Sequence, residues 1–277
     1  MWADDSHLTT LFLQVNAEQA CYQIAQNVIP RLASDWLSAV QGVETAVWQQ
    51  IDNHLSADYA NAALSLPKGY TDFMAVMDTV SMTPANGRLF LGNSLPIRHL
   101  DQFARPSQTP LHVYANRGAS GIDGNISTAL GFGAASNSPL VAVLGDITFY
   151  HDMNGLLAVA GCEMQVAGKE TPPAARHAPP TTIVVLNNNG GGIFRRLPIS
   201  QIEPPFTDLF LTPHNLDFEH AARLYNLDFV RVTNQAEFRQ ALGESLYNPG
   251  ATLIEVVTNG RSDHEAWRKV IAQTKGT

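Results

Sequence analysis

Short runs of apolar residues, each followed by a polar or glycine-rich turn, organise the chain from about residue 88 onward. Five such runs occur, at 88–91, 111–114, 140–144, 182–186 and 252–257, and helical segments separate them. Strands that are apolar along their whole length are buried on both faces, as in parallel sheets covered by helices. The sequence therefore predicts an α/β fold, with a parallel sheet that carries helices on both faces and polar turns at the carboxyl ends of its strands.

The first 62 residues follow a different pattern. Apolar positions recur at helical spacing from about Leu8 to Ala62, and no strand-like run interrupts them. Pro30 and Gly42 divide this stretch into two or three helices. We expect a helical segment at 1–62, as at the end of a preceding domain with its linker, and one α/β domain at 63–277 that begins with a further helix ending near Met82.

One segment breaks the alternation of strands and helices. Residues 166–180 contain four prolines in two pairs, which cannot continue a helix. The segment predicts a surface excursion between the helix after Asp146 and the strand that ends at Leu186.

Composition narrows the class of protein and of partner. The chain has 277 residues, 45% hydrophobic and 15% charged, which is enough to bury a large core. Seventeen Lys and Arg against 25 Asp and Glu give a net charge of −8, and no window is dominated by basic residues, which argues against nucleic acid as a partner. The two cysteines, Cys21 and Cys162, are far apart in the sequence and form no C-x-x-C pair. No stretch approaches the roughly 18 apolar residues of a membrane span, and the first residues show no leader pattern. We expect a soluble, cytoplasmic protein.

Two polar turns that follow neighbouring runs carry the first candidate chemistry. Gly145-Asp146 ends one predicted strand and Asn187-Asn188-Asn189-Gly190 ends the next. Adjacent parallel strands would bring these turns together, and carboxylate, amide and backbone carbonyl oxygens are the ligands that Mg2+ prefers. A helix that opens after Asp146 would direct free N–H groups at a diphosphate. Taken singly, Asp146 is better explained as a helix cap and the asparagines as turn formers, but the two turns together favour a site for a metal and a diphosphate.

Two further loops contain arginines among small residues. The segment 116–124 reads NRGASGIDG, in which three glycines allow close approach to a ligand and Arg117 offers a fork suited to carboxylates. The segment 92–98 reads GNSLPIR and places Ser94 and Arg98 on one face if a helix begins there. Alone, this second segment reads as an ordinary capped helix.

These motifs resemble those of a known family. Gly145-Asp146 followed by Asn187-Asn188 resembles the thiamine diphosphate motif of thiamine-dependent decarboxylases and carboligases. More narrowly, GNSLPIR at 92–98, NRGASGIDG at 116–124, GDITFYHDMNGL at 145–156 and NNNGGGIF at 187–194 are similar to the C-terminal half of the 2-succinyl-5-enolpyruvyl-6-hydroxy-3-cyclohexene-1-carboxylate synthase family of menaquinone biosynthesis. The segment NRGASGIDG is the most specific of the four. The chain departs from the usual GDG at Ile147, and the proline-rich excursion lengthens the spacing between the GD and NN motifs.

The resemblance implies a role for each matched residue. Mg2+ (or Mn2+) would be held by Asp146, Asn188 and the Gly190 carbonyl, and Ile122 would be the apolar wedge that bends thiamine diphosphate. The remaining cofactor contacts would be Gly145, Ile147, Thr148, Asn187 and Phe194. The substrates would face Ser94, Arg98, Arg117, Ile193 and Leu197.

The implied reaction is decarboxylation of 2-oxoglutarate and addition of the resulting succinyl-semialdehyde carbanion to isochorismate. Both substrates are dicarboxylates, which suits two fixed guanidinium groups. These enzymes also need a pyrimidine-binding domain whose glutamate activates the cofactor, and residues 1–62 would correspond only to the end of the middle domain. The resemblance therefore implies a C-terminal portion with little or no activity alone, which would work as a homodimer or homotetramer.

Two alternatives stay open. Another thiamine-dependent 2-oxo acid decarboxylase or carboligase is disfavoured by NRGASGIDG and by the paired arginines. A non-catalytic α/β binding module is the other, although Gly131-Phe132-Gly133 is too short for a dinucleotide fingerprint. The low charged fraction further predicts that the isolated chain self-associates or exposes an apolar face.

Overall fold

The computed structural model describes residues 69–104, 109–160 and 179–274. The helical segment expected at 1–62, the boundary at residue 62, both cysteines and residues 166–178 of the proline-rich segment lie outside the described residues.

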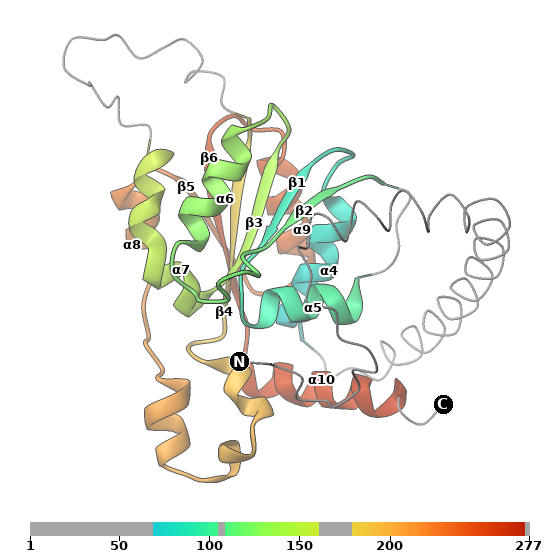
Figure 1. Ribbon diagram of the computed structural model, residues 1–277, viewed down its shortest axis with the longest axis vertical. Helices are drawn as coiled ribbons and strands as arrows, with labels where there is room; N and C mark the ends of the chain where they lie inside the picture. Colours follow the sequence, from blue (N-terminus) through green and yellow to red (C-terminus); the bar gives the residue numbers. More distant parts are fainter. Residues whose placement is uncertain (1–68, 105–108, 161–178, 275–277) are drawn as a thin grey trace, which may run out of the picture. The chain divides into compact units, whose positions relative to one another are not determined.

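The described residues form a six-stranded parallel sheet with the strand order β2-β1-β3-β4-β6-β5 (Figure 1). The strands are β1 (Arg88–Leu91), β2 (His112–Tyr114), β3 (Leu140–Gly145), β4 (Thr181–Asn187), β5 (Asp228–Val232) and β6 (Ala251–Val257). The predicted α/β fold and all five predicted strands are confirmed. The edge strand β5 was not predicted, because Asp228 and Arg231 interrupt its apolar run and most of its side chains are exposed.

Helices connect the strands. The α-helices are α4 (Asp72–Met82), α5 (Leu95–Phe103), α6 (Asn125–Ala134), α7 (Asp146–Asp152), α8 (Glu219–Leu224), α9 (Gln235–Ser245) and α10 (Gly260–Thr274). Shorter helical turns are η1 (Met153–Ala158), η3 (Gly192–Arg196), η4 (Pro198–Gln201) and the π-turn η5 (Thr207–Leu211). The helix predicted to end near Met82 is α4, which Thr71 caps by accepting a hydrogen bond from the Met74 N–H. None of the helices among the described residues is long and apolar enough to cross a membrane.

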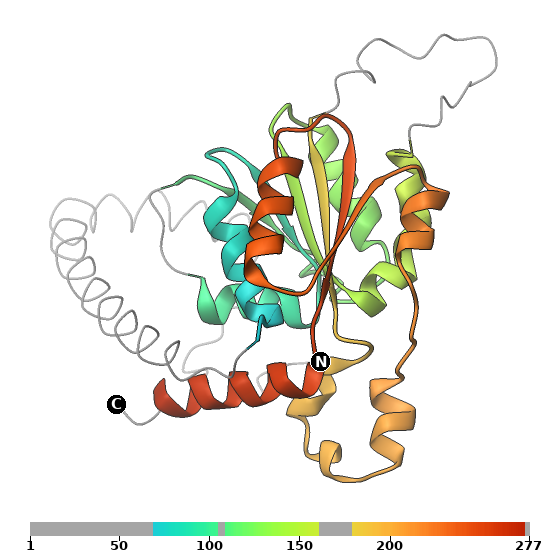
Figure 2. The same ribbon diagram turned by 180° about the vertical axis from the view of Figure 1, so that it is seen from behind.

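Both faces of the sheet are covered, as the alternating strand side chains require (Figure 2). On one face, Val141 and Val143 of β3 pack with α4 and α9. On the other face, Ala142 and Leu144 pack with α6, α7, η1 and α8. The core is therefore a three-layer α/β/α sandwich, which holds the carboxyl strand ends rigidly in place.

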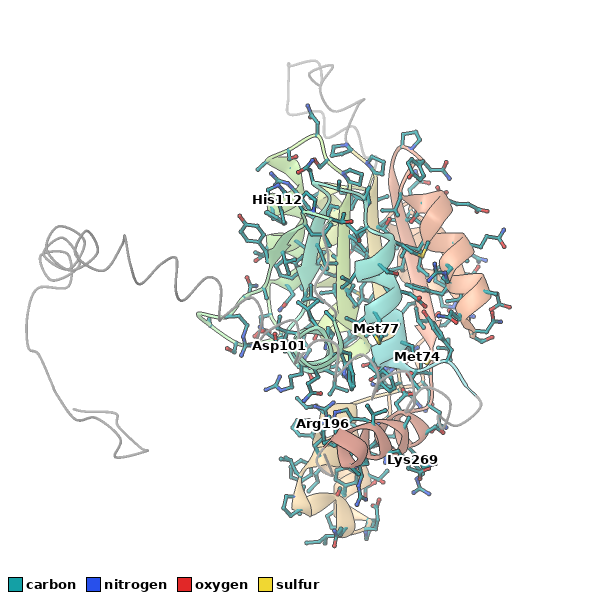
Figure 3. All side chains as sticks on the ribbon, turned by 90° about the vertical axis from the view of Figure 1, so that its right-hand side faces the viewer. Met74, Met77, Asp101, His112, Arg196 and Lys269 are labelled. Carbon is teal, nitrogen blue, oxygen red and sulfur yellow. The ribbon has the colours of Figure 1, made fainter. Side chains whose placement is uncertain are left out.

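The last helix, α10, lies beyond the carboxyl ends of the strands (Figures 1 and 3). Its Ala266 and Val270 are buried against Phe73 of α4 and Phe103 of α5, with Met74 and Met77 partly buried beside them. The Arg196 guanidinium of η3 stacks 4.1 Å from the centre of the Trp267 ring. These contacts fix α10 close to the polar turns where ligands of parallel sheets bind.

Candidate functional site

Asp146 lies where β3 turns into α7, and its side chain is buried. One oxygen, Oδ1, accepts a hydrogen bond of 2.8 Å from the Ile147 N–H, and Oδ2 accepts one of 2.9 Å from the Gly190 N–H. The two turns meet because β3 and β4 are adjacent and parallel, as predicted. The sequence predicts free N–H groups at the start of this helix, whereas the Ile147 N–H donates to Asp146. The residue before the seven-residue α7 is Gly145, which has no side chain to cap the helix.

The turn after β4 is shaped around two backbone requirements. Gly190 has a φ of +136°, and a Cβ there would lie 2.0 Å from the Leu211 carbonyl oxygen, so only glycine fits. Gly192 leaves room for the side chain of Asn188, whose amide a Cβ at position 192 would contact at 2.7 Å. The Asn188 Oδ1 atom is buried and has no hydrogen-bond partner among the described residues. A buried acceptor of this kind has an unmet need for a positive partner.

These oxygens suit a hard divalent cation. A carboxylate, a buried and unpartnered amide oxygen and the Gly190 carbonyl belong to the set of ligands that Mg2+ and Mn2+ prefer. Elsewhere among the described residues, no group of three His, Cys, Asp or Glu side chains is placed to hold a metal. The chemistry of this donor set therefore fits the predicted cation.

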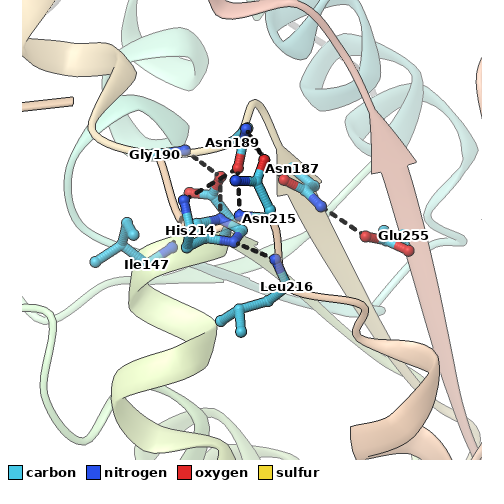
Figure 4. Close-up of polar contacts among 9 residues, drawn as sticks. Ile147, Asn187, Asn189, Gly190, His214, Asn215, Leu216 and Glu255 are labelled. Atoms are coloured by element: carbon cyan, nitrogen blue, oxygen red, sulfur yellow. Dashed lines mark hydrogen bonds and ion pairs between the residues drawn. The ribbon is translucent and has the colours of Figure 1, made fainter. Parts of the chain in front are cut away.

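His214 was assigned no role from the sequence, yet it contacts Asp146 (Figure 4). Its Nδ1 accepts a hydrogen bond of 2.9 Å from the Leu216 N–H, which leaves the proton on Nε2. The Nε2 atom lies 3.2 Å from Asp146 Oδ2 and so donates to it. Asn189 holds the segment in place, because its Oδ1 accepts from the His214 and Asn215 N–H groups at 3.2 and 2.8 Å. His214 thus orients the carboxylate, as partners of metal ligands commonly do.

Glu255 supports the same turn from inside the sheet. It is 1% exposed, and its Oε1 accepts a hydrogen bond of 2.6 Å from Asn187 Nδ2. Its Oε2 accepts one of 2.7 Å from Arg231 Nε, and this carboxylate and Asp217 raise the pKa of Arg231 above its usual value. Asn187 Oδ1 in turn accepts from the Asn189 N–H at 3.0 Å. The signal in the sequence was one acidic residue inside the apolar run 252–257.

The loop 116–124 is tied to the loop after β1 through Asn93. Asn93 Oδ1 accepts a hydrogen bond of 2.7 Å from Arg117, and Asn93 Nδ2 donates one of 2.6 Å to the Gly121 carbonyl. Ile122 is half-buried in this loop. The structure therefore joins the two predicted loops, with the Arg117 side chain held at their surface.

The other predicted substrate contacts lie on α5 and η3. Arg98 is exposed and donates to the Ser94 carbonyl at 2.7 Å, one turn back on α5. Leu197 directly follows η3 and is 45% exposed. Phe194, a predicted cofactor contact on η3, is 37% exposed, so both side chains leave apolar surface facing solvent. Thr148 is buried on α7.

A buried polar cluster that the sequence did not predict lies under α10. His99 Nε2 is 3.1 Å from Asp72 Oδ2, at an angle too poor for a hydrogen bond, and His99 Nδ1 has no partner among the described residues. Burial and then the nearby Asp72 carboxylate raise the pKa of Asp263 to about 8. Asp72, His99 and Asp263 line a small cavity together with Arg196, and burial lowers the pKa of Arg196.

Comparisons with known proteins relate this chain to thiamine-dependent enzymes. The family described as "Thiamine pyrophosphate enzyme, C-terminal TPP binding domain" matches residues 160–256. A 2-succinyl-5-enolpyruvyl-6-hydroxy-3-cyclohexene-1-carboxylate synthase of Roseiflexus sp. is 46% identical over 95% of this chain and 41% of its own length. The same synthase of Roseiflexus castenholzii is 47% identical over 95% and 41%, and that of Haloarcula marismortui 36% identical over 100% and 42%. The chain thus spans about two fifths of the length of these relatives.

Solved structures show the same fold. The benzoylformate decarboxylase of Polynucleobacter necessarius matches with a TM-score of 0.53 and 17% identity, over 70% of this chain and 34% of that one. The thiamine diphosphate-dependent 4-hydroxybenzoylformate decarboxylase of Rhodococcus jostii RHA1 matches with a TM-score of 0.51 and 21% identity, over 70% and 33%. At this identity the likeness concerns the fold alone.

Proposed function

Since this chain is related to the C-terminal portion of the 2-succinyl-5-enolpyruvyl-6-hydroxy-3-cyclohexene-1-carboxylate synthases, we propose that it forms the diphosphate-binding half of a thiamine-dependent carboligase site. The observation that carries the proposal is the meeting of Asp146 with the turn that holds the unpartnered Asn188 oxygen. Bound thiamine diphosphate supplies the electron sink for decarboxylation. The protein's task is to hold and orient it.

The cation, Mg2+ or Mn2+, would lie between Asp146 Oδ1, Asn188 Oδ1 and the Gly190 carbonyl. Asp146 Oδ1 retains a lone pair beyond the one that the Ile147 N–H uses, so it can both accept that bond and bind a cation. The backbone from Gly145 to Thr148 would receive the diphosphate, with Ile122, Asn187 and Phe194 completing the cofactor contacts. His214 and Glu255 would hold these ligands in place without contacting the cofactor.

The substrates of this site would be 2-oxoglutarate and isochorismate. Arg98 on α5 and Arg117 in the loop after β2 are both exposed, so their guanidinium groups can receive carboxylates from solvent. Ser94, Ile193 and Leu197 would form the remaining substrate contacts. A dicarboxylate donor is what two such arginines favour over a monocarboxylate such as pyruvate.

We further propose that residues 1–277 alone turn over little or no substrate. The resemblance assigns the activating glutamate to a pyrimidine-binding domain outside these residues, so turnover would need that domain within a cytoplasmic homodimer or homotetramer. Several apolar side chains are exposed on the described surface, among them Tyr150 at 50% and Leu157 at 54%, which supports contact with further protein.

Calorimetric titration of the chain with thiamine diphosphate, with and without Mg2+, tests the proposal. We expect binding that requires Mg2+ and that weakens at least about 100-fold in Asp146→Ala, because a ligand carboxylate is lost. Asp101→Ala removes an exposed carboxylate of α5 and should leave binding unchanged. Metal-dependent binding that survives Asp146→Ala would contradict the ligand assignment, and a wild-type chain that bound no cofactor would contradict a self-sufficient diphosphate site.

The substrate assignment needs a separate test. With the chain combined with a pyrimidine-binding domain of a related synthase, we expect 2-oxoglutarate to be decarboxylated in preference to pyruvate. Preference for pyruvate would overturn the substrate assignment while leaving the cofactor site intact.

A further inference from the structure

A cleft of about 510 Å3 opens beside the turn that follows β4. Its walls come from that turn, from η3 and η5, and from the start of α10. None of Gly145, Asp146, Ile147 and Thr148 lines it, so it differs from the surface to which we assign the diphosphate. Its volume lies in the range of small-molecule sites.

Two arginines line this cleft without a carboxylate partner. Arg195 comes from η3 and Arg261 from the first turn of α10, and neither forms an ion pair with any residue that the structure describes. Glu203 is a carboxylate whose charge acts on Arg195, and its two oxygens accept hydrogen bonds from the Thr207 N–H and hydroxyl at 3.2 and 3.0 Å. Since it forms no ion pair with Arg195, the cleft carries two guanidinium groups that are unpaired among the described residues.

The guanidinium group of Arg195 is unfavourably placed in this cleft. Its Nε atom is buried and lacks a hydrogen-bond partner among the described residues, as does the hydroxyl oxygen of Thr258 in the same cleft. Burial and then the neighbouring charge of Arg261 lower the pKa of Arg195. The positive end of the 15-residue helix α10 adds to the repulsion, although Asn259 caps that helix by accepting from the Arg261 and Ser262 N–H groups at 3.1 Å each.

From this geometry we propose that the cleft is a separate anion site, which binds the phosphate group of a small polar molecule between Arg195 and Arg261. A phosphate monoester is a dianion near neutral pH, so it matches two guanidinium groups and accepts several hydrogen bonds at once. Asn188, Asn189, Thr207 and Thr258 also line the cleft, and the unpartnered Thr258 hydroxyl suits a polar remainder of the ligand. A monocarboxylate would neutralise only one of the two charges.

The site is distinct from the substrate arginines of the proposed function. Arg98 and Arg117 follow β1 and β2, whereas Arg195 and Arg261 follow β4 and β6, and none of the first pair lines this cleft. Because Asn188 and Gly190 line the cleft and also belong to the proposed cation site, a bound anion would contact the same turn. The inference does not rest on the proposed function, since the cleft and its charges are present whatever the cation site binds.

Titration calorimetry of the whole chain with inorganic phosphate tests the proposal, in 0.15 M NaCl with a chelator that removes divalent cations. We expect one phosphate per chain, with affinity reduced about tenfold or more in Arg195→Gln and in Arg261→Gln, because each removes a charge-assisted hydrogen bond. Arg261 is exposed, so its variant tests the site even if Arg195→Gln disturbs folding. Arg268→Gln is the matched control, since it removes the same charge from α10 about 10 Å further along, beyond the Debye length of about 8 Å.

Four outcomes would overturn the inference. Phosphate affinity that is unchanged in both Arg195→Gln and Arg261→Gln would place the anion elsewhere, and an equal loss in Arg268→Gln would reveal only a general charge effect. Absence of phosphate binding in the wild-type chain would remove the site altogether. Succinate, titrated in a parallel arm, should bind less tightly, and a succinate affinity equal to or above that of phosphate would refute the phosphate assignment.

Discussion

Gly190→Ala tests whether the turn after β4 needs glycine for its shape. The added Cβ would lie 2.0 Å from the Leu211 carbonyl oxygen, and the backbone φ of +136° is one that side chains other than glycine rarely adopt. Either the turn or the π-turn η5 must move to relieve this contact. Such a movement also displaces the Gly190 N–H from Asp146 Oδ2.

The size of the effect follows from two contributions. A non-glycine residue in a sparsely populated backbone conformation costs about 1–3 kcal/mol. Forcing an extra methyl group into a packed contact with backbone costs about 1–3 kcal/mol more. We therefore expect Gly190→Ala to lower the free energy of unfolding by about 2–6 kcal/mol.

Urea unfolding followed by circular dichroism at helical wavelengths measures this loss as a shift of the midpoint. Gly131→Ala on α6 is the control, because its Cβ meets no atom within 4 Å and its residue is exposed. Alanine is favoured over glycine inside a helix, so the control should raise the free energy of unfolding by up to about 1 kcal/mol. A loss below about 1 kcal/mol in Gly190→Ala, or the same loss in Gly131→Ala, would refute the steric reasoning.

Three further substitutions probe the contacts around the site, each by urea unfolding of the whole chain. His214→Ala removes one hydrogen bond to a buried carboxylate and one from the backbone, so it should lower the free energy of unfolding by about 1–3 kcal/mol. The same change at the exposed His220 should lower it by less than about 0.5 kcal/mol, and equal losses would deny His214 its role. Glu255→Gln removes the buried negative charge that Arg231 pairs with and should lower the free energy of unfolding by about 2 kcal/mol, and a neutral result would show that Arg231 needs no charged acceptor there. The folded chain keeps the Asp263 proton to about pH 8, while the unfolded chain releases it near its usual pKa of 3.8, so this group makes the free energy of unfolding fall between those values. Asp263→Asn should flatten that slope between pH 5 and pH 8, and an unchanged slope would contradict the raised pKa.

Most of the sheet could be predicted from the sequence because its central strands are buried on both faces. Such strands carry a continuous apolar stretch, as β3 does at 140–144 and β4 at 183–186, and their parallel adjacency brings Asp146 to Gly190. The edge strand β5 escaped prediction because only one side of an edge strand needs apolar residues, and DFVRV resembles a loop in composition. Burial thus makes a strand easier to predict without being required, since the other edge strand, β2, was predicted although its three side chains are exposed.

The contacts that orient the predicted ligands could not be found in the same way. His214 lies 68 positions from Asp146, in an irregular segment without periodicity, so no spacing rule connects the two. The polar cluster under α10 likewise brings together Asp72, His99 and Asp263 from three helices, and it depends on how α10 packs against α4 and α5. These contacts depend on tertiary packing, which cannot be predicted from the local sequence pattern.

The three consecutive asparagines after β4 show why a motif is more specific than its composition suggests. Asn187 donates inward to Glu255, Asn188 keeps a buried oxygen unpartnered, and Asn189, at a φ of +62°, accepts from the backbone of the His214 segment. The first needs an amide donor, the second a neutral hard oxygen, and the third a residue that tolerates the left-handed region while still accepting hydrogen bonds. Asparagine is the side chain that meets all three needs, so the repeat reflects three separate constraints that converge on one turn.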